Sequence, residues 1–354
     1  MPRILAVAPV LPENVHEQHE ITAELAGRLS GDRAARSVLE RVHAASGIRT
    51  RHLALPLDRY RDLDSFSETN ALFADLALPL VEQAVTMALD AAGLRVEDVD
   101  HLFFTTVTGV QAPSIDAMLA TSLGFRSDLK RVPSFGLGCV AGAAGIARVA
   151  DYLAGHPTGV ALLVSVELCS LTLQWSDQSM ANVVGTGIFG DGAAAIVMTG
   201  DAHPAAVAAG ASKPRVIGSR SALYPDSSEM IGWQIGSTGF TLMLAAGVPA
   251  LIDGHFAAGV DALLAEAGIE RSDVDRWIAH PGGPRILESF TAALDLPPAA
   301  LDASWEVMAR TGNLSSAAVL HVLAAVGDQP DGTRAVLFSL GPGVTAELVL
   351  LEWS

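Results

Sequence analysis

Three residues that lie far apart in the sequence have the types and local settings that catalysis needs. Cys139 lies in GLGCVAGAAG, where small residues on both sides predict a sharp turn that presents the thiol at the start of a helix. His280 follows the apolar run DRWIA and precedes PGGP, so its ring is expected at the carboxyl end of a strand, where α/β folds place their sites. Asn313 lies in RTGNLSSAA, directly after a glycine.

A cysteine, a histidine and an asparagine from separate segments suit acyl-thioester chemistry. The N–H groups and the dipole at a helix N-terminus favour a Cys139 thiolate, which is the form that attacks an acyl group. His280 Nε2 and the Asn313 amide would then donate hydrogen bonds to a thioester carbonyl, or to the enolate left when a malonyl thioester loses carbon dioxide. Simpler interpretations stay open, namely an inert buried cysteine, a structural histidine and a helix-capping asparagine. Cys169, in ELCSLTLQW, lacks glycine neighbours and is expected to be an inert core cysteine.

The chain contains an internal duplication that relates two of these residues. The segment AGLRVEDVDHLFFTTVTG from residue 92 is answered by AGIERSDVDRWIAHPGG from residue 267, an offset of 175 residues. GCVAGAAGIARVADYL is answered at nearly the same offset by GNLSSAAVLHVLAAVG, and GVALLVS by TRAVLFS. A period this long is not a solenoid repeat. It predicts a duplicated α/β unit with a pseudo-twofold axis, in which Cys139 and Asn313 are equivalent and two helix N-termini meet at one site.

Alternating strand and helix periodicities predict sheets with helices on both faces. The expected elements include helices over 72–94 and 248–268, helices from residues 113 and 284, and strands over 101–106, 159–167, 276–280, 334–340 and 344–352. Residues 200–215 are the most loop-like, and we divide the chain there into halves of 1–205 and 206–354. GTGIFG at 185–190 matches a dinucleotide-binding pattern, but it lacks the required strand–turn–helix setting and is dismissed.

Composition narrows the partners and the compartment. Of 354 residues, 50% are hydrophobic and 17% are charged, which is ample material for buried sheets. Lys and Arg number 22 against 39 Asp and Glu, and the net charge of −17 argues against nucleic acid or an anionic membrane as the main partner. The longest uninterrupted apolar runs are too short to span a bilayer. Two cysteines without metal-binding spacing predict no metal site and a cytoplasmic protein.

Taken together, the motifs resemble those of the type III polyketide synthases, the chalcone-synthase-like branch of the thiolase superfamily. GLGCVAGAAG resembles the nucleophile motif, AHPGGPRIL the histidine motif and GNLSSAAV the asparagine motif, while FGDGAAAIV and the closing SLGPGVTAELVLLEW resemble further signatures. The resemblance covers nearly the whole chain. It implies a thiolase-like α/β fold, in which two duplicated βαβ-rich halves form five αβαβα layers, and a homodimer.

The resemblance also assigns roles to residues. Cys139 matches the acyl-accepting nucleophile, while His280 and Asn313 match the pair that promotes decarboxylation. Phe189 in GIFGDG and Phe240 in STGFTLML resemble two gatekeeper phenylalanines between a coenzyme A tunnel and the cavity in which the chain grows.

Thr172 lies near a cavity-lining position that governs polyketide length. Arg41 matches one basic residue that grips the phosphates of coenzyme A, but Val38 and Ala45 stand where plant members carry lysines. Arg285, just after HPGGP, is the expected replacement. Solvated surface arginines are the simpler interpretation for both.

Two departures argue against chalcone itself as the product. Ala112 replaces a methionine that reaches across the plant dimer, and Val107 replaces a threonine linked to cyclisation. Residues 227–252 look most like the bacterial alkylresorcinol and alkylpyrone synthases, which load a fatty acyl-CoA and extend it with malonyl-CoA or methylmalonyl-CoA. Coenzyme A thioesters would be substrates, and no resident cofactor is expected.

Three alternatives remain at this stage. A tetrahydroxynaphthalene-type synthase is the neighbouring possibility within the family. An initiating ketoacyl-ACP synthase has the same fold but stops after one condensation and uses an acyl carrier protein. A catalytically inactive partner subunit of the thiolase fold belongs to a different class of function.

Overall fold

The strands of the two halves join into one mixed sheet. The computed structural model describes residues 1–29, 31–63 and 65–354. Within them, nine strands follow the order β11-β12-β13-β8-β1-β7-β6-β4-β5. The strands of the first half are β1 (Arg3–Val10), β4 (His101–Thr106), β5 (Lys130–Phe135), β6 (Val160–Leu168) and β7 (Asp191–Thr199). Those of the second half are β8 (Pro214–Leu223), β11 (Arg276–Ala279), β12 (Arg334–Gly341) and β13 (Thr345–Trp353).

The strand pairing confirms the duplication. In the first half β4 runs parallel to β6, which runs antiparallel to β7, which runs antiparallel to β1. The second half repeats this with β11, β12, β13 and β8. The two sets of strands meet where β1 pairs with β8 through Arg3 and Arg215. β5 is an additional edge strand that pairs with β4 in parallel.

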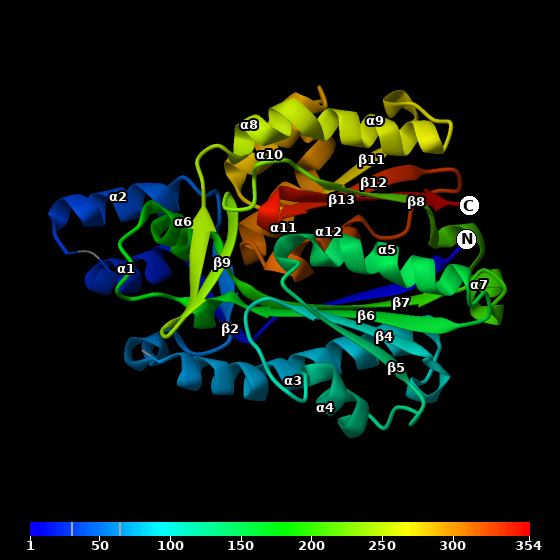
Figure 1. The fold of residues 1–354 in the computed structure, drawn as a ribbon, viewed down its shortest axis with the longest axis horizontal. Helices are drawn as coiled ribbons and strands as arrows, with labels where there is room; N and C mark the ends of the chain where they lie inside the picture. The colour runs from blue at the N-terminus through cyan, green and yellow to red at the C-terminus, as the bar shows by residue number, and fades with distance from the viewer. Residues whose placement is uncertain (30, 64) are drawn as a thin grey trace.

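Helices divide the molecule into five layers, as expected of a thiolase-like fold (Figure 1). One outer layer holds α3 (Phe66–Ala92) and α4 (Ile115–Ser122), and the other holds α8 (Val248–Leu251), α9 (Ala257–Glu266) and α10 (Pro284–Ala293). The middle layer contains α5 (Ala141–Ala154) and α12 (Ala318–Val326), which lie between the two sets of strands. α11 (Asp302–Thr311) precedes α12, and the short α7 (Pro204–Ala209) links the halves.

A group of smaller elements lies at one end of the layers. It comprises α1 (Gln18–Leu29), α2 (Arg33–Ala44), α6 (Met180–Ile188), the β2–β3 pair (Asn14–Glu17 and Thr50–Leu53) and the β9–β10 hairpin (Ile231–Gly236 and Gly239–Leu244). The 3₁₀ turns η1 (Leu57–Asp62), η3 (Gly138–Val140), η4 (Cys169–Thr172), η9 (Ser315–Ala317) and η10 (Pro342–Val344) connect the main elements.

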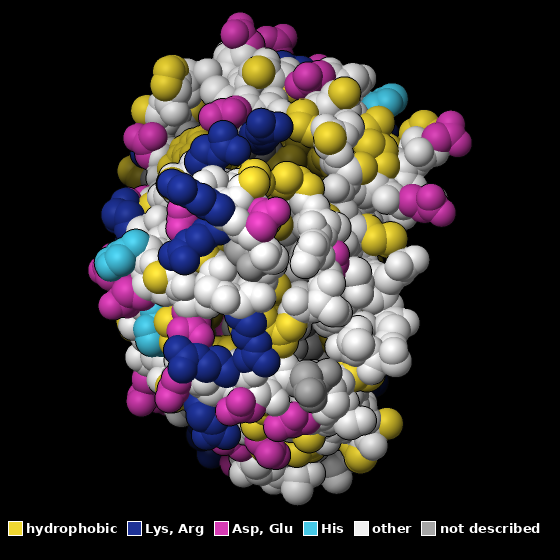
Figure 2. Space-filling view, turned by 90° about the vertical axis from the view of Figure 1, so that its left-hand side faces the viewer, with side chains coloured by type: hydrophobic (Ala, Val, Ile, Leu, Met, Phe, Trp, Pro, Cys, Tyr) yellow, Lys and Arg dark blue, Asp and Glu magenta, His cyan; other side chains and the backbone are white. Residues whose placement is uncertain are grey.

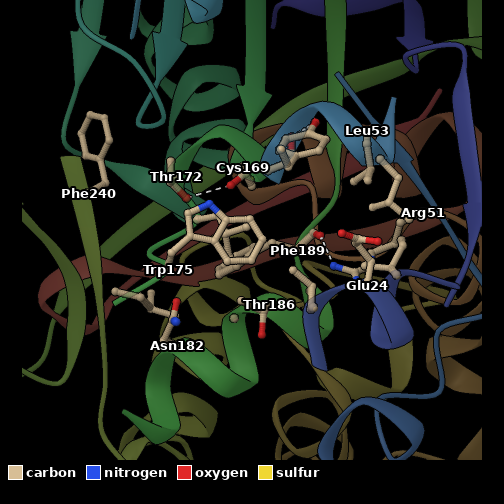
Figure 3. A pocket seen from close by; sticks show the side chains of 18 of the residues that line it. Glu24, Arg51, Leu53, Cys169, Thr172, Trp175, Asn182, Thr186, Phe189 and Phe240 are labelled. Carbon is tan, nitrogen blue, oxygen red and sulfur yellow. Dashed lines mark hydrogen bonds between the residues drawn. The ribbon is translucent and has the colours of Figure 1, made fainter. Parts of the chain in front are cut away.

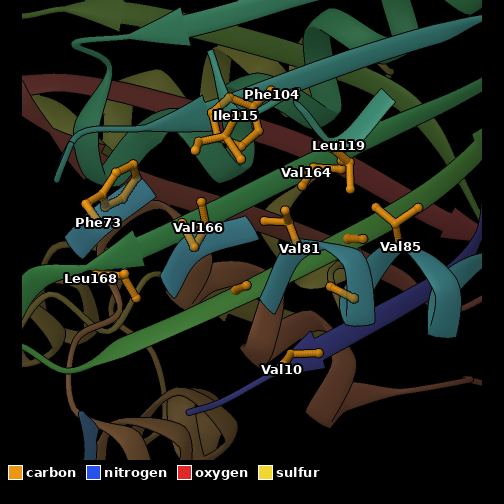
Figure 4. Close-up of a cluster of buried hydrophobic side chains, with 14 of the residues drawn as sticks. Val10, Phe73, Val81, Val85, Phe104, Ile115, Leu119, Val164, Val166 and Leu168 are labelled. Carbon is orange, nitrogen blue, oxygen red and sulfur yellow. The ribbon is translucent and has the colours of Figure 1, made fainter. Parts of the chain in front are cut away.

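Helix α3 covers the outer face of the first set of strands. The Ser65 hydroxyl accepts a hydrogen bond from the Glu68 N–H at its start, and Gly93 ends it in a left-handed conformation (φ 65°). Phe73, Val81 and Val85 of α3 pack against strand residues (Figure 4). α3 and the continuous helix Val248–Glu266 are long and apolar enough to cross a membrane, by length and composition alone. The sequence analysis considered only uninterrupted apolar runs and therefore did not identify these two helices. Packing on the sheet accounts for the apolar face of α3.

Small residues bring the middle layer close to the site. A Cβ on Gly142 of α5 would lie only 2.4 Å from the Ser316 carbonyl oxygen and 2.7 Å from Val319 Cγ1. Because a side chain at this position would force the segments apart, glycine sets the distance at which α5 meets η9 and α12. The two helix starts that carry Cys139 and Asn313 therefore lie together.

The observed elements differ from the expected ones in a few places. The helix expected from residue 72 begins at Phe66, and the helix over 248–268 contains a π-helical turn at Ile252–Phe256. The expected loop at 200–215 contains α7, so the division at 205/206 falls inside a short helix. GTGIFG lies at the end of α6 and in the turn that follows, and not between a strand and a helix. This setting agrees with its rejection as a dinucleotide-binding site.

Candidate active site

Cys139 lies in the 3₁₀ turn that leads into α5, as the glycine pattern predicts. Gly138 has φ +55°, and a Cβ there would lie 2.6 Å from Pro342 Cγ. A Cβ at Gly341 would lie 2.9 Å from Val140 N, so the SLGPGV segment packs directly on the turn that carries the cysteine. The Cys139 thiol is partly exposed, and its Sγ lies 3.7 Å from Ser315 Oγ in the equivalent turn of the second half.

Asn313 is fixed from several sides. Gly312 before it has φ +74°, where a side chain would be strained and would meet the Ile188 carbonyl oxygen at 2.6 Å. The Asn313 N–H donates to Ile188 O at 2.8 Å, and its carbonyl accepts from the Gly190 N–H at 3.1 Å. Its side-chain Oδ1 accepts from the Ser315 N–H at 2.8 Å, so the Nδ2 donor points away from the helix.

His280 directly follows β11 and is 1% exposed. Its backbone N–H donates to Phe338 O at 2.8 Å, while Nδ1 has no hydrogen-bond partner among the described residues. Asn313 Nδ2 lies 3.4 Å from the carbonyl oxygen of Gly282, and the Gly282 backbone lies beside the imidazole ring. These contacts bring the segments of Cys139, Asn313 and His280 together, but the hydrogen bond found for the thiol goes to Ser315 and not to His280.

Glu167 lies beneath the site, and the sequence interpretation missed it. Its carboxylate is fully buried and accepts hydrogen bonds from the Val107 N–H at 3.0 Å, from Thr108 Oγ1 at 2.9 Å, from Ser315 Oγ at 3.3 Å and from Ser316 Oγ. Burial raises the pKa of this carboxyl and the hydrogen bonds oppose the rise. A single acidic residue within the apolar run GVALLVSVEL was the signal available in the sequence.

The electrostatic environment opposes a resting thiolate. Burial raises the pKa of Cys139 to about 12, with a contribution from Glu167, while the Ser315 hydrogen bond acts in the opposite direction. Burial lowers the pKa of His280 to about 3. In this structure both groups are therefore neutral near pH 7. The helix N-terminus exists as expected, but desolvation outweighs its effect on the thiol.

A cavity of about 60 Å³ lies next to this cluster, and its wall includes Phe189, Phe240 and Thr172 (Figure 3). Thr172 Oγ1 donates to Cys169 O at 2.7 Å, so this hydroxyl is bonded within its own turn. Cys169 is buried, as expected, but it lines the cavity. Cys139 and His280 are not among the lining residues, and Phe189 connects the two regions because it pairs with Asn313.

Three aromatic side chains, Phe189, Trp233 and Phe240, form part of the cavity wall. Trp233 lies between the two expected gatekeepers, with ring centroids 5.9 Å from Phe189 and 6.4 Å from Phe240. Phe240 also contacts Phe66 at 5.5 Å and Phe135 at 6.4 Å. The sequence interpretation did not identify Trp233, because only the folded β9–β10 hairpin brings this ring beside both phenylalanines.

The two arginines expected at the coenzyme A entrance are exposed and lie outside the cavity wall. Arg41 is in the last turn of α2 and Arg285 in the first turn of α10. Lys and Arg side chains gather on the face that bears α1 and α2 (Figure 2). α2 also carries exposed Arg33 and Arg36, so this face is locally basic in an acidic protein. No group of three His, Cys, Asp or Glu residues suited to a metal ion occurs in the described part of the chain.

Nearly the whole chain is similar to proteins of one known family. The family profile for chalcone and stilbene synthases matches through its N-terminal domain at residues 2–202 and through its C-terminal domain at residues 216–353. A 1,3,6,8-tetrahydroxynaphthalene synthase from Streptomyces peucetius subsp. caesius is 48% identical over 99% of this chain and 93% of its own length.

More distant relatives agree in length and fold. An alpha-pyrone synthesis polyketide synthase-like protein from Mycobacterium tuberculosis is 32% identical over 99% of this chain and 90% of its own. The crystal structure of the 1,3,6,8-tetrahydroxynaphthalene synthase of Streptomyces coelicolor A3(2), a bacterial type III polyketide synthase, superposes with a TM-score of 0.93 at 32% identity, covering 99% of each chain.

Proposed function

The chain belongs to the chalcone and stilbene synthase family and is a type III polyketide synthase, an acyltransferase, and on this premise we propose that it makes a tetrahydroxynaphthalene-type product from malonyl-CoA. The near-full-length similarity to a tetrahydroxynaphthalene synthase carries the proposal.

An alkylresorcinol or alkylpyrone synthase that loads a fatty acyl-CoA is the second candidate. It is supported by the similarity to the alpha-pyrone synthesis protein and by the leucines that line the cavity, including Leu25, Leu53 and Leu242. Extension by malonyl-CoA or by methylmalonyl-CoA is compatible with this candidate.

One product assay separates the candidates. The purified chain is incubated with ¹³C-labelled malonyl-CoA alone and, in parallel, with hexanoyl-CoA plus malonyl-CoA. We expect a fully labelled tetrahydroxynaphthalene from malonyl-CoA alone. Pyrones formed only in the hexanoyl-CoA reaction would overturn this proposal in favour of the alkyl product, and a single-condensation product would indicate an initiating ketosynthase.

In the proposed mechanism, Cys139 attacks the carbonyl of an acyl-CoA. A carbon–sulfur bond forms to Cys139 as the bond to coenzyme A breaks, and the thiol proton passes through His280 to the departing coenzyme A thiolate. Because both groups are neutral at rest, this proton moves during the attack rather than before it. The developing charge then lies near the start of α5, where the helix N–H groups stabilise it.

Chain extension uses the other two residues. His280 Nε2 and Asn313 Nδ2 donate hydrogen bonds to the thioester oxygen of malonyl-CoA. The carbon–carbon bond to the carboxylate breaks and carbon dioxide leaves. The electron pair of this bond remains on the thioester fragment as an enolate, whose oxygen these two donors stabilise. The enolate carbon attacks the acyl group on Cys139, and the cysteine sulfur leaves. No step requires a metal or a resident cofactor.

The surroundings supply positioning and access. Phe189 and Phe240 separate the entrance from the cavity, Thr172 limits the cavity, and Arg41 and Arg285 bind coenzyme A phosphates. The basic face around α2 supports the last role in a chain whose net charge is −17. We place the enzyme in the cytoplasm.

We also propose a homodimer formed through the edge of the sheet at β5. Every residue of β4, β6 and β7 is buried, whereas β5 is exposed along most of its length. Val132 and Phe135 of β5 are 42% and 47% exposed, and neighbouring Val110 is 37% exposed. β5 also carries exposed Lys130 and Arg131, so the apolar contact with a second copy would centre on Val132, Phe135 and Val110.

A further inference from the structure

Arg51 of β3 is a buried cation with no role in the chemistry described so far. It is 3% exposed, and burial lowers its pKa to about 10, so the guanidinium remains charged near pH 7. The charge of the buried Asp191 opposes that lowering of the pKa. Burying a charged guanidinium costs free energy, which its hydrogen bonds must offset. The partners of these hydrogen bonds therefore indicate what Arg51 holds in place.

The hydrogen bonds of Arg51 reach the turn between α6 and β7. Nη1 donates to the carbonyl oxygen of Phe189 at 2.7 Å, and Nε donates to Gln18 Oε1 at 2.9 Å. Gln18 in turn donates from Nε2 to the Gly187 carbonyl oxygen at 2.8 Å. Two side chains from outside the layered core therefore fix the carbonyls on either side of Ile188.

The same turn holds Asn313 from the other side. Ile188 O accepts from the Asn313 N–H, and the Gly190 N–H donates to Asn313 O, which together form a parallel bridge centred on Phe189. The stem of Arg51 also packs on Gly312, because a Cβ there would lie 3.1 Å from Arg51 Cδ. Arg51 thus contacts both peptide segments of this bridge.

We propose that Arg51 is a positioning residue for the decarboxylation step, which orients the Asn313 amide by holding the Phe189 peptide against Gly312 and Asn313. This inference rests on the proposed function of Asn313 as a donor to the malonyl thioester. The amide needs an accurate direction, since a misplacement of about 1 Å can cost about 10²-fold in rate. Cys139 is held separately, by the η3 turn and Pro342.

The test measures two partial reactions in the full-length enzyme. Malonyl-CoA decarboxylation reports on Asn313, and acyl loading of Cys139, followed by mass spectrometry, does not. Arg51→Lys and Arg51→Gln should each lower decarboxylation by at least about tenfold while loading stays within about twofold of the parent. Arg49→Gln is the matched control, because Arg49 is an exposed neighbour that pairs with Glu306, and it should change neither rate.

A double-mutant cycle separates positioning from a general structural effect. In an Asn313→Ala background, Arg51→Gln should cause no further loss of decarboxylation, because the group that it positions is gone. Multiplicative losses, or equal losses of loading and decarboxylation, would overturn the inference. If the Arg51 variants do not fold, Gln18→Ala removes only the outer support and should lower decarboxylation selectively by a few-fold. An unchanged rate in Gln18→Ala would then overturn it.

The inference and the function can fail separately. A parent enzyme that does not decarboxylate malonyl-CoA contradicts the proposed function before any variant is measured. A parent enzyme that does, together with fully active Arg51 variants, contradicts the inference alone.

Discussion

The two halves of the molecule share one backbone design and differ in the residue that each presents at its centre. A glycine with positive φ precedes both Cys139 and Asn313, and a 3₁₀ turn leads each segment into a helix of the middle layer. The side chains that surround them have diverged. Glu167 and Asp191 are buried carboxyls of the first half, and His280 and His321 are buried imidazoles of the second half. Each half also buries a group of the other type, His43 in the first and Glu347 in the second.

This difference shows how a duplicated unit acquires two chemical roles. The backbone of each half delivers a side chain to adjoining turns. In the proposed mechanism the residue type at that position makes Cys139 the nucleophile and Asn313 a hydrogen-bond donor. The third proposed participant, His280, has no counterpart of its type in the first half, where the repeat aligns FTTVT with AHPGG. Three experiments would test how far the two halves have specialised.

The largest effect is expected at the nucleophile. Cys139→Ala should abolish acyl loading, because no other thiol replaces it at the start of α5. Incubation with an acyl-CoA followed by peptide mapping distinguishes an adduct on the Cys139 peptide from one on the Cys169 peptide. An adduct that persists in Cys139→Ala would show that the first half does not carry the acceptor.

The donor in the second half should have a smaller and selective effect. Asn313→Ala should lower malonyl-CoA decarboxylation by about 10²–10³-fold, the usual loss for one donor to a developing oxyanion, while loading of Cys139 persists. The two rates are measured on the same preparation. Decarboxylation at the parent rate would contradict the role proposed for Asn313.

The smallest effect concerns the pH dependence of stability, on which His321 of the second half and Asp191 of the first should act with opposite signs. Burial lowers the pKa of His321 to about 4, so the unfolded chain gains a proton below about 6.5 that the folded protein does not. This histidine therefore reduces the free energy of unfolding as pH falls, by up to about 1.4 kcal/mol per pH unit. Burial raises the pKa of Asp191 to about 6, so the folded protein binds a proton here at a higher pH than the unfolded chain does. Asp191 therefore increases the free energy of unfolding as pH falls from 6 towards 4.

Urea unfolding at pH values between 6.5 and 5 measures these slopes. As pH falls, the free energy of unfolding should decrease less steeply in His321→Asn and more steeply in Asp191→Asn than in the parent protein. Equal slopes in both buried-site variants would show that these groups do not titrate differently in the folded and unfolded states.

Local sequence patterns were sufficient for the parts of the site that depend on local geometry. Glycine before Cys139 and Asn313 predicts tight turns at helix starts, and both turns occur. The repeat predicts that the two starts meet, because equivalent segments about a pseudo-twofold axis occupy equivalent places. The five-layer fold was implied by the resemblance to the family motifs.

The sequence by itself therefore determined the fold, the duplication and the three residues at its centre, since these depend on short-range turn chemistry and on the spacing of repeated segments. Tertiary structure alone decided the surroundings, which come from residues far apart in the chain. Glu167 reaches the turn of Ser315 across the middle layer, Trp233 enters the wall between the phenylalanines, and Arg51 holds the Phe189 peptide. Desolvation also belongs to this level, because the burial that keeps Cys139 neutral at rest arises only when both halves pack.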